Sequence, residues 1–147
     1  MITVFFGPPG AGKTTLALKE MKPGDVIVDS DLLFSAISGT PMYGGDKMLL
    51  KLVLDVRDYL ISRSAAGIWR YSGIWIVTSS RKLAERMRSE YQARVLYVDV
   101  SEEECIYRIA QDTRRNENIK MWEGIVHKWF EENKPFPRDV VIENERR

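Results

Sequence analysis

The 147-residue chain has the length of one ordinary domain, which predicts a single structural unit over residues 1–147. Its 22 basic and 21 acidic residues nearly cancel, so the charge balance excludes a protein-wide basic field for nucleic acid or membranes. A lone cysteine excludes an internal disulfide framework, and no apolar run is long enough to span a bilayer. We therefore expect a cytoplasmic protein with no membrane partner.

Short apolar runs alternate with helical patterns along the chain. The expected strands cover residues 2–6, 25–29, 74–78, 94–99 and 139–143, and the expected helices cover about 13–21, 31–37, 46–65, 81–91, 102–111 and 119–130, with a loop at 40–45. Strands that alternate with helices predict an α/β fold with a parallel sheet covered on both faces. Ligands of such sheets bind at the carboxyl ends of the strands.

The segment GPPGAGKTT directly follows the first apolar run. The order G-x-x-x-x-G-K-T is typical of a P-loop, whose backbone N–H groups curl around a phosphate at the start of a helix. Lys13 is expected to reach the β and γ phosphates of a nucleotide, and the Thr14 hydroxyl is expected to bind Mg²⁺. The predicted residues for binding ATP are Gly7, Pro8, Pro9, Gly10, Ala11, Gly12, Lys13, Thr14 and Thr15.

Other features narrow the class of P-loop protein. The guanine-reading motif N-K-x-D is missing, because the Asn-Lys pair at 133–134 is followed by Pro-Phe. The strand at 74–78 is followed by two serines and carries no carboxylate at its end, which argues against a ring-forming motor ATPase. A small kinase, in which one domain closes over ATP and an acceptor, fits the remaining pattern.

A kinase needs a carboxylate near the γ-phosphate, either to accept the proton of the acceptor hydroxyl or to organise Mg²⁺. Asp29 and Asp31 lie where the second predicted strand ends, at the ligand edge of the sheet. We favour Asp31 as the base, with a helix N-cap as its alternative role. Asp29 is then expected to hold Mg²⁺ or the acceptor, and the sequence leaves the two assignments open to exchange.

Positive charge is expected near the end of the helix that follows the fourth strand. Arg108, Asp112 and Arg115 are spaced to lie on one side of that helix, with Arg114 close by. One interpretation is an exposed Arg108–Asp112 ion pair. The other, which we favour, is a lid at about 108–118 in which the three arginines clamp the polyphosphate of ATP.

Two further arginines are candidates for binding the acceptor, together with Asp29 and Asp31. Arg57 lies among apolar positions of the helix at 46–65, so its side chain either reaches solvent or points into a cleft. Arg81 begins the helix after the third strand and would face the ligand edge. We regard Arg81 as the weaker candidate for an acceptor phosphate.

Several residues of the last two helices are expected to pack in the interior. Trp122 and Trp129 belong to an aromatic stripe with helical spacing, which favours core packing over a base-stacking platform. Cys105 and His127 lie on or beside apolar stripes and are likewise interpreted as packing residues rather than as a nucleophile or a metal ligand.

Taken together, these motifs resemble the P-loop kinases related to nucleotide kinases, polynucleotide kinase and the zeta-toxin type. The resemblance rests on GPPGAGKTT, on the Asp pair of VIVDSD, and on VDVSEEECIYRIAQDTRR followed by MWEGIVHKWF. The pattern is also similar to small ATP-binding proteins that are often encoded by phages, which would place the protein in the host cytoplasm. It implies a P-loop three-layer α/β/α fold with five strands in the order 2-3-1-4-5, Asp31 as base, and lid arginines at 108, 114 and 115.

The predicted activity is transfer of the γ-phosphate of ATP to a hydroxyl or phosphate of a nucleoside, a nucleotide or a polynucleotide end. ATP and Mg²⁺ are the expected cofactors. The predicted catalytic residues are Lys13, Asp31, Arg108, Arg114 and Arg115. The alternative is a regulatory module that binds or hydrolyses ATP and recruits a protein or DNA partner in its ATP form.

Overall fold

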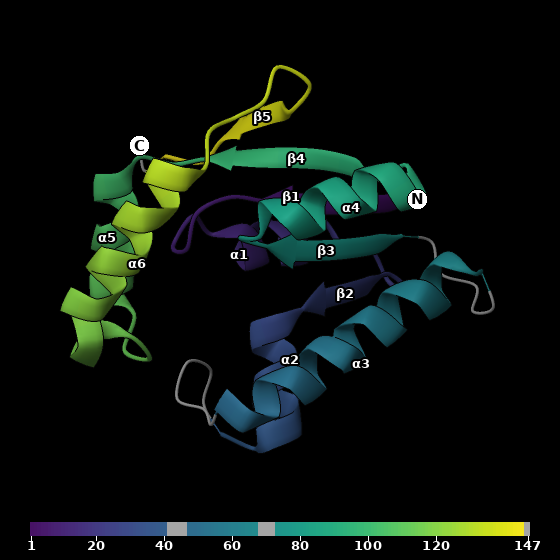
Figure 1. Ribbon diagram of the computed structural model, residues 1–147, viewed down its shortest axis with the longest axis horizontal. Helices are drawn as coiled ribbons and strands as arrows, with labels where there is room; N and C mark the ends of the chain where they lie inside the picture. The colour runs from purple at the N-terminus through teal and green to yellow at the C-terminus, as the bar shows by residue number, and fades with distance from the viewer. Residues whose placement is uncertain (41–46, 68–72, 146–147) are drawn as a thin grey trace.

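The computed structural model describes residues 1–40, 47–67 and 73–145. A parallel sheet forms its centre, with the strand order β2-β3-β1-β4-β5 (Figure 1). The strands are β1 (Ile2–Phe6), β2 (Val26–Asp29), β3 (Ile74–Thr78), β4 (Arg94–Asp99) and β5 (Val140–Glu143). The predicted α/β class and the strand order are confirmed.

The helices that flank this sheet begin and end close to the predicted positions. They are α1 (Lys13–Glu20), α2 (Ser30–Ser38), α3 (Lys47–Ala65), α4 (Arg81–Tyr91), α5 (Glu102–Gln111) and α6 (Ile119–Glu132), with a short 3₁₀ helix η1 (Asn116–Asn118). Residues 41–45 of the predicted loop lie outside the described residues. None of the described helices combines the length and the hydropathy needed to cross a membrane.

Apolar side chains pack against both faces of the sheet, because successive residues of a strand point to opposite faces. In β1, Val4 and Phe6 belong to the layer that includes α3 and α4, whereas Phe5 belongs to the layer that includes α1 and α5. Helix α6 contributes Trp129 to the first layer and Val126 to the second. Burial on both faces explains why the strands read as continuous apolar runs.

Side-chain caps fix where three of the helices begin. Ser80 accepts a hydrogen bond from the N–H of Leu83 at the start of α4, and Ser101 caps α5 in the same way by accepting from the N–H of Glu104. At α2 the cap is Asp29 and not Asp31, which corrects the alternative role predicted for Asp31. The physical reason is that β2 passes into α2 without a loop, so the last strand residue is already the cap.

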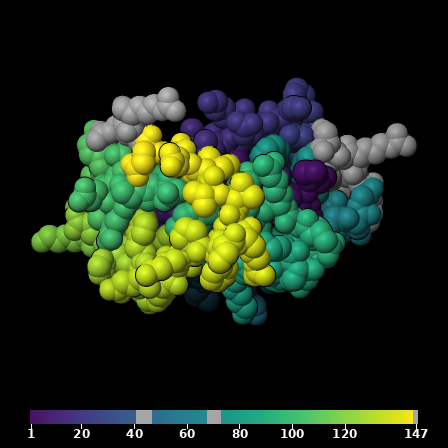
Figure 2. Space-filling model, turned by 90° about the horizontal axis from the view of Figure 1, so that it is seen from above, coloured from purple at the N-terminus to yellow at the C-terminus, as the bar shows by residue number. Residues whose placement is uncertain are grey.

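A cluster of charges and aromatic rings anchors the segment before β5 to α4. The side chain of Asp139 is 0% exposed and accepts hydrogen bonds from Arg81 at 2.8 Å and from Arg88 at 2.6 Å. The guanidinium of Arg81 lies over the rings of Phe6 and Phe136, at 4.2 and 4.1 Å from their centroids. Figure 2 shows the C-terminal segment, in yellow, lying across this face of the molecule. The cluster therefore fixes the position of β5 at the sheet edge.

Replacing Asp139 with Asn is expected to destabilise the protein by about 3 kcal/mol, because Arg81 and Arg88 would lose the buried anion that compensates their charge. The free energy of unfolding, measured by urea denaturation, checks this value. Lys128→Gln is the control, because Lys128 and Glu132 form an ion pair that is 73% and 61% exposed. Its removal should cost less than about 1 kcal/mol. Equal stability of the two variants would contradict the role of the cluster.

The acid dependence of stability gives a second readout of the same substitution. Burial raises the pKa of Asp139, but hydrogen bonds from Arg81, the Phe136 amide and Arg88 lower it by more than burial raises it. The pKa of Asp139 therefore lies below the ordinary value of 3.8. The carboxylate therefore contributes stability that is complete above about pH 4 and is lost as the pH falls through its folded-state pKa. Asp139→Asn should lose this part of the acid transition.

Candidate active site

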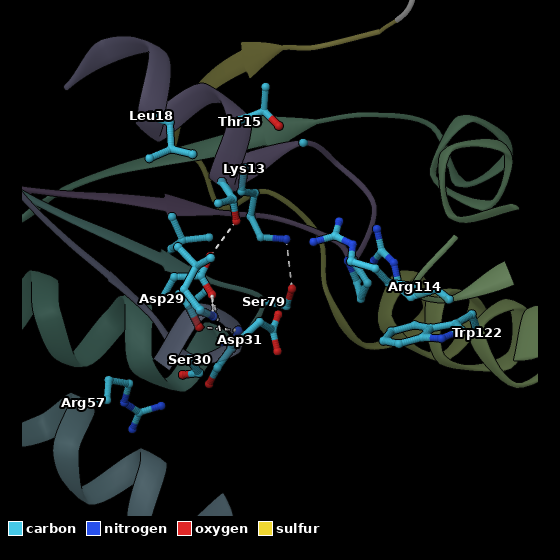
Figure 3. A pocket seen from close by; sticks show the side chains of 18 residues that line it. Lys13, Thr15, Leu18, Asp29, Ser30, Asp31, Arg57, Ser79, Arg114 and Trp122 are labelled. Carbon is cyan, nitrogen blue, oxygen red and sulfur yellow. Dashed lines mark hydrogen bonds between the residues drawn. The ribbon is translucent and has the colours of Figure 1, made fainter. Parts of the chain in front are cut away.

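A cleft of about 580 Å³ opens at the carboxyl ends of β1, β2 and β3 (Figure 3). The predicted residues that line it are Pro9, Gly12, Lys13, Thr14, Thr15, Asp29, Asp31, Arg57, Arg114 and Arg115. They come from the P-loop and α1, from the junction of β2 and α2, from α3, and from the turn after α5. The fold thus brings together side chains that are separated by more than a hundred residues in the sequence.

The P-loop contains two glycines that no other residue could replace without strain. Gly10 and Gly12 have φ values of 82° and 81°, in the left-handed region that side chains disfavour. A Cβ on Gly10 would lie 2.7 Å from the carbonyl oxygen of Cys105, and one on Gly12 would lie 2.8 Å from Nδ2 of Asn144. Gly12 is the N-cap of α1, so the positive end of the helix dipole faces the cleft.

Lys13 is buried at the centre of the cleft. Its Nζ donates hydrogen bonds to the carbonyl oxygen of Pro8 at 2.6 Å and to Oγ of Ser79 at 3.0 Å, the second of which is drawn in Figure 3. Burial lowers the pKa of Lys13 from 10.5 to about 8, because the interior stabilises the charged form less than water does. Lys13 therefore keeps its positive charge at neutral pH and titrates just above it.

Thr14 and Asp29 form a pair of oxygen donors beside Lys13. Oγ1 of Thr14 donates to Oδ2 of Asp29 at 2.5 Å, while Oδ1 of Asp29 accepts from the N–H of Asp31 at 2.8 Å. Mg²⁺ in nucleotide sites is held by one or two protein oxygens, with phosphate oxygens and water completing the octahedron. A hydroxyl and a buried carboxylate in contact at the phosphate loop fit this requirement.

Asp31 and Arg57 lie on the α2 and α3 side of the cleft. Asp31 is in the first turn of α2 and is exposed to the cleft, whereas Asp29 is buried by its capping role. The side chain of Arg57 is 16% exposed, and its Nε donates to Oδ1 of Asp58 at 3.0 Å. Figure 3 shows Arg57 on the same side as Ser30 and Asp31. Of the two orientations left open by the sequence, Arg57 adopts the one that points into the cleft.

Arg114 and Arg115 line the opposite side of the cleft, and Asp112 holds both. Oδ1 of Asp112 accepts from Nε of Arg114 and Oδ2 accepts from Nε of Arg115, each at 2.9 Å. Hydrogen bonds from Arg114 are the largest cause that lowers the pKa of Asp112 to about 2. The carboxylate therefore stays ionised and keeps the two guanidinium groups close together.

The predicted helical spacing of Arg108, Asp112 and Arg115 is wrong, because α5 ends at Gln111. Oδ1 of Asp112 accepts from the backbone N–H of Arg114 at 3.0 Å, and this local bond competes with continuation of the helix. As a result Arg108 pairs with Glu104, through Nε at 3.0 Å, and not with Asp112.

Arg108 and Arg81 are not among the residues that line the cleft. Arg108 donates through Nη1 to the carbonyl oxygen of Ala11 at 3.1 Å, on the outer side of the P-loop. Arg81 is held by Asp139 in the cluster before β5. The structure therefore does not bring Arg108 to the phosphate position or Arg81 to the acceptor position that the sequence analysis predicted.

Eight residues that line the cleft were not predicted as site residues, Trp122 and Ser79 among them, and the side chain of His127 was misplaced. Trp122 was expected in the core, but it lines the cleft with Arg115 stacked 5.3 Å from its ring, whereas Trp129 is buried as predicted. Ser79 follows β3 at the ligand edge, a position that could have identified it. His127 is 63% exposed and pairs with glutamates on α5 and α6, so its predicted packing role is wrong.

Comparison with known protein families assigns the chain to one of them. A family model described as an AAA domain matches residues 2–131. The chain belongs to this AAA domain family. A search of curated protein sequences found no match to the chain.

Solved structures share the fold of this AAA domain protein at low sequence identity. A chain of the Pnkp1/Rnl/Hen1 RNA repair complex matches with a TM-score of 0.59 and 16% identity, over 95% of this chain and 48% of that one. This protein thus spans about half the length of that relative. A gluconokinase from Sinorhizobium meliloti 1021 matches with a TM-score of 0.53 and 15% identity, over 97% and 82% of the two chains. Shikimate kinase from Acinetobacter baumannii, in complex with shikimate, matches with a TM-score of 0.52 and 16% identity, over 99% of this chain and 84% of that one.

Binding of a nucleotide is expected to raise the pKa of Lys13, because the phosphates add negative charge beside its Nζ. From a starting pKa of about 8, binding at pH 8 should take up on the order of half a proton. Calorimetric titration with a non-hydrolysable ATP analogue, in two buffers of different ionisation enthalpy, measures this uptake.

Lys13→Met should abolish the proton uptake even at protein concentrations that restore binding. Phosphate oxygens are not expected to contribute, because their last pKa is near 6, well below the pH of the experiment. A wild-type protein that binds the analogue at pH 8 without any proton uptake would contradict the assignment of Lys13 as the phosphate contact.

Proposed function

We propose that this protein is an ATP-dependent kinase that transfers the γ-phosphate to an acceptor bound against α2 and α3. One observation carries the proposal: Lys13, Asp31 and Arg114 come from three separate segments and line the same cleft. A loop that only bound a nucleotide would not need a carboxylate and a cluster of arginines facing it. The fold that the chain shares with a gluconokinase and a shikimate kinase also supports a kinase function.

The nucleotide binds through the backbone of residues 7–15 and through Lys13. Thr14 and Asp29 would hold Mg²⁺, and the metal would supply positive charge that neutralises the phosphate oxygens. Asp29 is suited to this role and not to that of a base. Its carboxylate already accepts hydrogen bonds from Thr14, from the Asp31 amide and from the Leu32 amide.

Asp31 acts as the general base. It accepts the proton of the acceptor hydroxyl, the acceptor oxygen forms a bond to the γ-phosphorus, and the bond from that phosphorus to the β-bridging oxygen breaks with ADP as the leaving group. Lys13, Arg114 and Arg115 stabilise the negative charge on the transferred group. The turn and η1 between α5 and α6 act as the lid that excludes water.

The acceptor carries an anionic group that Arg57 binds. Arg57 lies on the same side of the cleft as Asp31, and its bond to Asp58 uses Nε and Nη2. A planar guanidinium can engage a phosphate or a carboxylate through its other N–H groups. A nucleotide or a polynucleotide end meets this requirement, and the acceptor hydroxyl would then face Asp31.

Incubation with ATP labelled at the γ-position and with pools of nucleosides, nucleotides, 5′-hydroxyl oligonucleotides and sugar acids tests the function. Label should move to one pool, and Asp31→Asn should slow transfer by at least about a hundredfold, because a positioned base contributes 10²–10⁴. The affinity for ATP should change little. Asp55→Asn is the control, because Asp55 is an exposed residue of α3 that does not line the cleft.

Release of label only as inorganic phosphate, with every pool, would contradict the kinase proposal. That result would favour the regulatory ATP-binding module. Equal transfer rates for Asp31→Asn and Asp55→Asn would instead remove Asp31 from the role of base.

Arg57→Gln is expected to raise the KM for the acceptor by about tenfold or more, because a hydrogen-bonded charge contributes roughly 1.5–3 kcal/mol. The KM for ATP should stay within about twofold, since Arg57 is remote from the nucleotide phosphates in the proposed arrangement. Asp58 would keep Arg86 as a partner at 3.1 Å, so no orphaned carboxylate is left. Arg63→Gln, on the same helix outside the cleft, is the control.

A further inference from the structure

We infer that Asn144 and Arg108 act together as positioning residues that orient the Ala11–Gly12 peptide of the P-loop toward a phosphate. The inference rests on the nucleotide-binding part of the proposed function and not on the transfer step. Asn144 directly follows β5, and its backbone N–H donates to the carbonyl oxygen of Asp99 at the end of β4, at 3.0 Å. Its side chain then reaches the P-loop, where Nδ2 donates to the carbonyl oxygen of Ala11 at 2.7 Å.

Arg108 donates to the same carbonyl oxygen from a different element. Its Nη1 lies 3.1 Å from the oxygen of Ala11, and its Nη2 donates to the backbone carbonyl of Asn144. Glu104, one turn earlier on α5, accepts from Nε at 3.0 Å and holds the guanidinium in place. Two donors therefore fix the direction of a single carbonyl group, one anchored to the end of β4 and the other to α5 and to the backbone of Asn144.

The direction of that carbonyl determines the direction of the next amide. A trans peptide is planar, with its C=O and its N–H pointing to opposite sides, and the described chain contains no cis peptide bond. Because the Ala11 carbonyl points toward Asn144 and Arg108, the N–H of Gly12 points away from them. Gly12 lines the cleft, so its N–H is available on the side where the phosphate binds.

The contact also explains a requirement at Gly12 beyond its backbone angle. A Cβ at this position would lie 2.8 Å from Nδ2 of Asn144 and 3.5 Å from Nη1 of Arg108. The first distance is too short for a real Cβ and the second is an ordinary van der Waals contact, so the Asn144 amide occupies the space that a side chain at position 12 would need. An amide fixed in this way before the ligand arrives binds an anion without the cost of ordering the loop.

Calorimetric titration of the whole chain with Mg·ADP and with pyrophosphate tests the inference. Asn144→Ala should weaken both ligands equally, by about five- to tenfold, because one hydrogen bond that fixes the loop is lost. Asn144→Asp should weaken both more strongly, since a carboxylate oxygen would face the carbonyl of Ala11. Arg108→Gln should show the same parallel loss. Asn133→Ala is the control, because its side chain makes a comparable bond, at 2.9 Å to the carbonyl of Trp129, away from the cleft.

Each other outcome has a distinct meaning. Loss of affinity for Mg·ADP with unchanged affinity for pyrophosphate would overturn the inference, because Asn144 would then contact the nucleoside and not orient the loop. Unchanged affinity for both ligands in Asn144→Ala would also overturn it. A wild-type chain that binds both ligands but transfers no phosphate would refute the proposed kinase function and leave the inference intact.

Discussion

The parallel pairing of β3 with both β1 and β2 determines where chemistry can occur in this protein. The register places Phe6 opposite Thr78 and Asp29 opposite Val77, so the three strands end at nearly the same level. As a result, three segments leave the sheet together at the carboxyl ends of these strands and lie side by side: the P-loop, the Asp29–Asp31 segment and Ser79. Because both faces of the sheet are filled by apolar side chains, polar groups gather at this edge, where water and ligands can reach them.

Two opposing sets of hydrogen bonds hold the P-loop in shape. From the cleft side, Lys13 donates to the carbonyl of Pro8. From the outer side, Arg108 and Asn144 donate to the carbonyl of Ala11. The loop is therefore fixed before a nucleotide arrives. Most of the conformational entropy that the loop loses is lost on folding and not on nucleotide binding. The Asp139 cluster contributes indirectly, since it anchors the strand that leads to Asn144.

Local signals were sufficient to predict the elements, whereas contacts between distant segments were not. The strands at 74–78 and 94–99 match the predicted bounds because continuous apolar runs mark buried parallel strands. The strand order came from family resemblance. Spacing alone could not show that Asp112 would end α5, that Trp122 would line the cleft, or that Asn144 would reach the P-loop. Each of these depends on which surface lies beside the residue, and sequence periodicity carries no information about that surface.

The central claim is that Lys13, Asp31 and the arginines of the α5–α6 turn converge on one γ-phosphate. A crystal structure with Mg²⁺ and a non-hydrolysable ATP analogue tests it most directly. The account predicts that Lys13 and at least one of Arg114 and Arg115 contact γ-phosphate oxygens, with the carboxylate of Asp31 facing the acceptor side of that group. A γ-phosphate directed out of the cleft, with Asp31 and both arginines away from it, would contradict the account.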